Sequence, residues 1–169
     1  VSPGRFTDFA TDFTSKSAAV MGLFNSHQQP DFRMRDVELS IRYFGLVNYL
    51  DGYTGNLKLF LDETSQKLNS EWDTLENIVR GQGLELENAI QVTWEIFSED
   101  AFRKWNGKDF ERRFNRAVFD VMVYFFRDKN TQQKALGNRH AVIEGFKKLC
   151  EQSAPFRTSI ETTTKSIGA

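Results

Sequence analysis

The chain has few cysteines, few prolines and no long apolar run, so it lacks the features typical of disulfide-bonded, strand-rich and membrane proteins. Its single cysteine, Cys150, excludes an internal disulfide and favours a reducing compartment. Proline occurs only 3 times, which suits long helices joined by few turns. No run approaches the roughly 20 apolar residues that span a bilayer, and the N-terminus lacks the basic and apolar regions of a signal peptide. We therefore expect a cytoplasmic protein without membrane contact.

Residues that carry chemistry are equally sparse. His140 and Cys150 stand about three turns apart on one expected helix, too far for a base and its nucleophile. His27 has no partner at metal-ligand spacing, and the Glu-x-x-His pattern of di-iron bundles is missing. Gly81 and Gly83 lack the strand and third glycine of a dinucleotide fingerprint and the Lys-Ser/Thr of a P-loop. We expect no catalytic residue, no cofactor and no metal, and the chain by itself is not expected to be an enzyme.

Phenylalanine, by contrast, is abundant at 16 residues, and apolar side chains recur at helical spacing along most of the chain. The densest run, 36–50, is apolar over most of its circumference, as is typical of a buried helix. A second helix, expected over 109–127, has a buried stripe and becomes apolar all round in its second half. The pattern predicts one all-α domain over 1–169, an irregular bundle of about six or seven helices around these two central helices.

The remaining segments follow the same periodicity. Ser2 and Pro3 suit the start of a first helix, and Asn138 suits the start of a late one. Gly81-Gln82-Gly83 either marks a break or sits in one long helix held by packing, and we favour a break or kink because each glycine costs about 1 kcal/mol inside a helix. Loops are expected over 98–108, where Phe102 and Trp105 fill the core, and over 129–137. The further helices are expected near 5–14, 56–69, 70–97 and 138–150, with a short last turn from Pro155.

The net charge of −1 averages two opposite stretches. Residues 51–100 carry 3 basic and 11 acidic side chains, whereas residues 101–150 carry 12 basic and 5 acidic ones. The stretches either face each other or form solvated faces, or else the basic one contacts nucleic acid, with Phe102 and Trp105 stacking on bases. Local ion pairs of Arg113 with Asp109 and of Arg116 with Asp120 would neutralise part of the charge of the basic stretch. The candidate nucleic-acid contact comprises Arg103, Lys104, Trp105, Lys108, Arg112, Arg113 and Arg116.

The run Met34-Arg35-Asp36-Val37-Glu38-Leu39-Ser40-Ile41-Arg42-Tyr43-Phe44 resembles an R-M-R-D-x-E-L-x-L-R-F signature. Residues 49–62 resemble its continuation, Y-x-G-N-L-K-x-F-L, and further similarities lie at 97–103, 114–120 and 156–164. The signature belongs to a large prokaryotic family with an N-terminal ParB-like, sulfiredoxin-like nuclease domain. Its members include GmrSD-type modification-dependent restriction enzymes and phosphorothioate-sensing defence proteins.

This resemblance implies a helical region that follows the nuclease domain. The family's catalytic Asp-Gly-Gln-Gln-Arg motif and its His-Asn-His domain are absent from the sequence, so no catalytic residue carries over. The Val1 start agrees with an excised piece. The resemblance implies a non-catalytic domain of a restriction-type or phage-defence nuclease, partnered by the parent's nuclease domain and also by DNA. Whether the parent is a nuclease or a nucleoside-triphosphatase stays open, as does the oligomeric state.

Four charged residues of the signature, Arg35, Asp36, Glu38 and Arg42, have two interpretations. They form either a capping and salt-bridge cluster or a docking site for the missing domain. The alternative to the whole assignment is a stand-alone helical protein that binds a protein partner and has an interaction or regulatory role.

Overall fold

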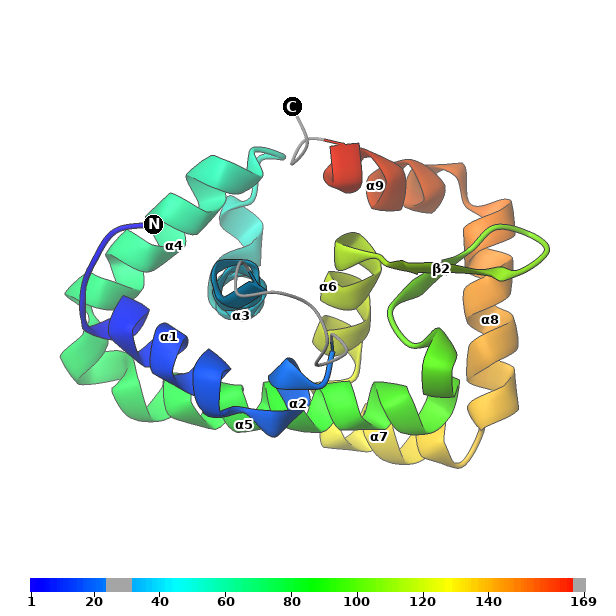
Figure 1. Cartoon of the computed structure of the whole chain (residues 1–169), viewed down its shortest axis with the longest axis horizontal. Helices are drawn as coiled ribbons and strands as arrows, with labels where there is room; N and C mark the ends of the chain where they lie inside the picture. Colours follow the sequence, from blue (N-terminus) through cyan, green and yellow to red (C-terminus); the bar gives the residue numbers. More distant parts are fainter. Residues whose placement is uncertain (24–31, 166–169) are drawn as a thin grey trace. The chain divides into compact units, whose positions relative to one another are not determined.

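The computed structural model describes residues 1–23 and 32–165, with side chains from residue 36 of the second range up to residue 161. This part of the chain is mostly helical, and the prediction of an all-α fold is confirmed apart from one short hairpin. Nine α-helices and two β-strands succeed one another in it (Figure 1). Contacts divide the chain into two compact units, residues 1–87 and 88–169, which are treated separately below. The expectation of a single domain stays a prediction.

Unit 1 is formed by helices around α3, and α1 packs on both α3 and α4. Residues 39–45 of α3 are all buried, so this helix is enclosed on every side, as its apolar circumference predicts. Aromatic rings fill the space between helices: Phe6 meets Phe44 edge-on at 5.7 Å, and Phe9 lies 5.3 Å from Trp72. The elements are α1 (Arg5–Lys16), α2 (Ala18–Met21), α3 (Phe32–Tyr49), the 3₁₀ turn η1 (Leu50–Gly52), α4 (Leu57–Ser70) and the first part of α5 (Trp72–Phe97).

The start of α1 is capped from a distant helix. The expected Ser2 cap is wrong, because the N-cap position is Gly4 and no cap side chain bonds there. Instead, the Asn69 Oδ1 atom at the end of α4 accepts bonds from the backbone N–H groups of Phe6 and Thr7, at 2.9 and 3.2 Å. A Cβ at position 4 would overlap the Asn69 carboxamide, so a larger residue there would have to displace this capping side chain. The first free amides of α1 are thus satisfied by tertiary structure.

The predicted break at Gly81–Gly83 is absent, because α5 runs continuously over 26 residues. Gly83 lies against the Phe13 ring, and an added Cβ would stand 3.0 Å from the ring's Cε2 atom. Between the glycines, Gln82 exchanges two amide hydrogen bonds with Asn48 of α3, at 2.8 and 2.9 Å. Packing within unit 1 therefore offsets the low helix propensity of these glycines.

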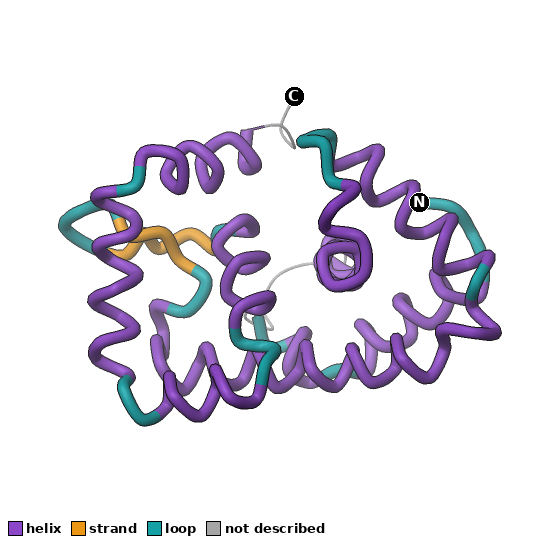
Figure 2. The backbone as a smooth tube through the Cα atoms, turned by 180° about the vertical axis from the view of Figure 1, so that it is seen from behind, coloured by secondary structure: helices purple, strands orange, loops and turns teal. Residues whose placement is uncertain are grey.

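Unit 2 places a hairpin between helices (Figure 2). α9 packs on α6 and α8, and β1 packs on α8 and α6. An aromatic cluster forms around the half-buried Phe146 of α8, which stacks parallel to Phe110 at 6.4 Å and meets Phe97 edge-on at 5.6 Å. The elements are the end of α5, the 3₁₀ turn η2 (Ser98–Asp100), β1 (Arg103–Trp105), β2 (Phe110–Phe114), α6 (Arg116–Phe125), α7 (Lys129–Leu136), α8 (Arg139–Gln152) and α9 (Ala154–Lys165).

Four expectations for unit 2 are wrong. The helix expected over 109–127 begins only at Arg116, because Asn115 stops the strand and caps the helix, its Oδ1 accepting from the Val118 N–H at 3.0 Å. The connection expected over 129–137 contains α7, which Asp128 caps. The last turn is the 12-residue α9. Asn138 precedes α8 but does not cap it, because its side chain donates to the carbonyl of Lys134 instead.

Candidate nucleic-acid interface

The basic cluster lies on a short antiparallel hairpin in unit 2. Arg103 pairs with Phe114 and Trp105 with Phe110, so three residues of β2 oppose the single residue Lys104. Such a bulge bends the strand and re-aims its side chains. The intervening turn is closed by Asn106, whose Oδ1 accepts from the N–H groups of residues 108 and 109 at 2.9 and 2.8 Å. The hairpin therefore presents residues 108–113 at its tip and along its bulged strand.

Aromatic side chains anchor this hairpin to the helices. Phe110 stacks on Phe146, while Phe114 and Phe102 pack on Phe119 of α6 at 5.8 and 5.1 Å. Phe102 is buried, with 1% of its surface exposed, and its φ of 63° lies in the left-handed region. Its carbonyl accepts from the Asn115 N–H at 2.8 Å, which joins the base of the hairpin to the start of α6. Burial of Phe102 confirms that it fills the core and shows that stacking of this ring on bases is a wrong expectation.

Trp105 is half-buried and is engaged by α8. Its Nε1–H donates to Glu151 Oε1 at 2.6 Å, and the Lys147 ammonium lies 4.5 Å from the ring centroid. Phe110 packs edge-on against the same ring at 5.1 Å. Glu151 and Lys147 had no signal in the sequence, since nothing there links residues about forty positions from the tryptophan.

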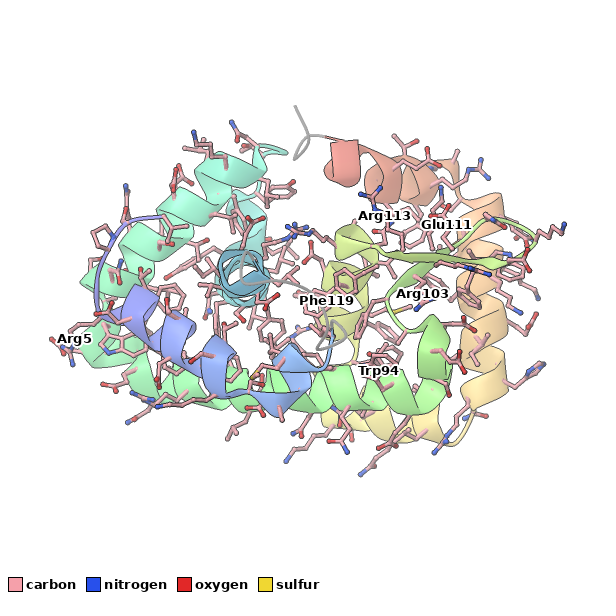
Figure 3. All side chains as sticks on the ribbon, viewed as in Figure 1. Arg5, Trp94, Arg103, Glu111, Arg113 and Phe119 are labelled. Atoms are coloured by element: carbon pink, nitrogen blue, oxygen red, sulfur yellow. The ribbon has the colours of Figure 1, made fainter. Side chains whose placement is uncertain are left out.

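The cations of the hairpin divide into paired and unpaired ones. Lys104 forms an ion pair with Glu161 of α9 at 2.5 Å, and only 14% of its side chain is exposed. Lys108, Arg112 and Arg113 are exposed, and within the described ranges none of them has an ion-pair partner. Arg103 is half-buried. In Figure 3, Arg113 lies on the side of the hairpin that faces α9, and Arg103 lies on the opposite side.

The expected pair of Arg113 with Asp109 is wrong, because those residues are on a hairpin. Four residues of a strand span about 13 Å, whereas four residues of a helix bring side chains together. Arg116 is the first residue of α6, so it belongs to the helix that follows the hairpin and is half-buried. The sequence cluster is therefore reduced to three exposed cations in residues 108–113.

The charge asymmetry of the sequence follows the two units. Residues 88–169 carry 14 basic and 10 acidic side chains, a net charge of +4, and residues 1–87 carry 8 basic and 13 acidic ones, a net charge of −5. The unit that contains the hairpin thus supplies a positive background, which favours approach by an anionic polymer.

The signature residues of α3 lie inside that helix. Because α3 begins at Phe32, Asp36 sits in the second turn and does not cap the start. Asp36 and Arg42 are buried, with 5% and 1% of their surfaces exposed, and Arg42 Nη1 lies 3.9 Å from Glu38 Oε1. The side chain of Arg35 lies outside the described residues. An ion pair between Arg42 and Glu38 is thus present at the long end of the distance range, and domain docking by these residues stays a prediction.

In the described part of the chain, the side chains that could serve as metal ligands or nucleophiles are not grouped into a site. No group of three or more His, Cys, Asp or Glu side chains there is placed to hold a metal ion. Cys150 is buried on α8, and burial is the main cause that raises the pKa of its thiol. His140, on the same helix, is exposed. Among the helices that the structure describes, none is both long and apolar enough to cross a bilayer.

Comparisons with known proteins add no further identification. No protein-family model, no curated protein and no solved structure matches the chain.

Proposed function

We propose that this chain is a non-catalytic helical domain that holds DNA through the phosphate contacts of its hairpin, within a restriction-type or phage-defence nuclease. One observation carries the DNA contact: Lys108, Arg112 and Arg113 are exposed on a hairpin that is anchored to α6 and α8, and carboxylates in the described residues leave them unpaired. The assignment to a nuclease is supported by the resemblance of 34–44 and 49–62 to the family signature. A cytoplasmic location agrees with a single, buried cysteine.

The geometry limits how many phosphates this surface reaches. Residues 108–113 span at most about 17 Å of extended chain, which covers two or three successive phosphates of a duplex strand. With three phosphate contacts, the logarithm of the binding constant should fall with the logarithm of the salt concentration with a slope of about −2.7. With one remaining contact, the slope should be about −0.9. Affinity is expected in the range of roughly 10⁻⁴ to 10⁻⁶ M, as for other sequence-independent contacts.

The test compares the whole chain with Arg112→Gln/Arg113→Gln by fluorescence anisotropy of a labelled DNA duplex over a series of salt concentrations. Glutamine keeps most of the side-chain length and removes the charge. The matched control, Lys129→Gln/Lys134→Gln, removes the same charge from exposed positions on α7. We expect the hairpin variant to lose about two units of slope and the control to keep nearly all of it. Equal losses in both variants, or no binding by the unaltered chain, would refute the DNA contact.

A further inference from the structure

We infer that the hairpin surface selects double-stranded DNA over single strands, because it offers charges to phosphates while its aromatic rings are already packed on other side chains of the protein. This inference rests on the proposed function and names the form of DNA that the same surface takes. It is carried by the positions of the aromatic side chains on residues 102–114.

Proteins that bind single strands combine a positive groove with exposed rings on which successive bases stack. The hairpin region has four aromatic residues, and each is committed to the protein. Phe110 and Phe114 pack on Phe146 and Phe119, and Phe102 is buried. Trp105 has its N–H on Glu151, Phe110 against its ring and Lys147 near the ring centroid. A base would have to displace these contacts before it could stack.

The exposed charged groups of the hairpin are three cations and the carboxylate of Asp109 in the turn. Lys108 sits in a turn closed by Asn106, and Arg112 and Arg113 follow on the bulged strand. A duplex presents its phosphates in a regular array, so little ordering is needed for such a fixed set of charges to meet them. A flexible single strand must be ordered on binding and gains no stacking in return.

Counterion release gives the size of the preference. Each phosphate contact contributes about 0.9 to the salt slope for a duplex and about 0.7 for a single strand. With three contacts, the two slopes differ by about 0.6, so two affinities that are equal at 1 M salt diverge to roughly eightfold tighter binding of the duplex near 30 mM salt. The preference should shrink as salt rises.

The experiment measures binding of the full chain to a fluorescent 20-base-pair duplex and to an unstructured 20-nucleotide oligothymidine at low salt. A Trp105→Leu variant, checked for helical content by circular dichroism, is measured beside it. We expect the duplex to bind several-fold tighter and the variant to change neither affinity by more than about twofold, since no base stacks on Trp105.

Three other outcomes are decisive in different ways. Equal or tighter binding of oligothymidine overturns the inference and leaves the proposed function standing. A selective loss of oligothymidine binding in a folded Trp105→Leu variant does the same, because it places a base on the indole. Absence of binding to both probes overturns the proposed function itself. If the variant does not fold, the ratio of the two affinities of the unaltered chain decides alone.

Discussion

Replacing Phe102 by glycine should destabilise unit 2 less than replacing it by alanine, which reverses the usual order. The residue joins η2 to the hairpin with a φ of 63°, a conformation that bulky L-residues rarely adopt. Its ring is almost fully buried and lies 5.1 Å from Phe119 and 5.8 Å from Phe114. Both substitutions remove the ring, so they differ chiefly in the backbone.

The magnitudes follow from these two features. Loss of a buried phenylalanine ring costs about 3–5 kcal/mol in either variant. The left-handed backbone destabilises the alanine variant by about 1–2 kcal/mol and does not destabilise the glycine variant. The greater freedom of glycine in the unfolded chain destabilises the glycine variant by about 0.5–1 kcal/mol. Phe102→Gly should therefore be more stable than Phe102→Ala by about 0.5–1 kcal/mol.

Phe119 provides the matched control. It is equally buried, also packs on Phe114, and lies within α6, where glycine is less favourable than alanine by about 1 kcal/mol. Phe119→Gly should therefore be less stable than Phe119→Ala. The glycine-minus-alanine difference should change sign between the two positions, with a total separation of about 1.5–2 kcal/mol.

Urea unfolding followed by tryptophan fluorescence measures these differences. A Trp72→Phe background leaves Trp94 and Trp105, which both belong to unit 2, as the only reporters. Because all variants lose one ring, their midpoints are compared at a common m-value. If Phe102→Ala proves as stable as Phe102→Gly, the left-handed backbone is not a source of strain, and the junction between η2 and β1 has been misjudged.

Two further predictions concern the helices. Gly81→Ala should stabilise the chain by about 0.5–1 kcal/mol and raise the urea midpoint, because its Cβ enters open space. Gly83→Ala should stabilise the chain less, or destabilise it, because its Cβ meets the Phe13 ring. A larger gain in stability at Gly83 than at Gly81 would contradict this. Hydrogen bonds from the backbone N–H and then the hydroxyl of Thr131 hold the pKa of Asp128 below its usual value, so its stabilisation is present at neutral pH and is lost as the pH falls through that lowered pKa. Asp128→Asn keeps an acceptor without the charge, so the stability advantage of the unaltered chain over this variant should shrink in acid, and urea midpoints that differ equally at neutral and acid pH would contradict this.

Helical periodicity was a reliable guide where a stripe of apolar residues continued for several turns. It predicted α3 and the buried part of α6, since packing and local spacing agree there. It failed at 110–114, where two phenylalanines four residues apart fit one helical face and also fit a bulged strand. Asn115 carried the missing signal, because an N-cap residue marks the start of a helix. Asp128 carried the same signal for α7.

The location of the basic cluster was predictable from composition. Which of its side chains are exposed and unpaired was not predictable. Lys104 and Trp105 are engaged by acids of α9 and α8, which lie 57 and 46 residues further along the chain. No local pattern reports such pairings, because they depend on how α8 and α9 return to the hairpin. The same return leaves Arg112 and Arg113 in solvent, since their strand bulges between the two anchored phenylalanines at its ends. Tertiary packing thus divides one run of basic residues into cations that hold the hairpin in place and cations that remain for a ligand, and any proposal about DNA must use only the second group.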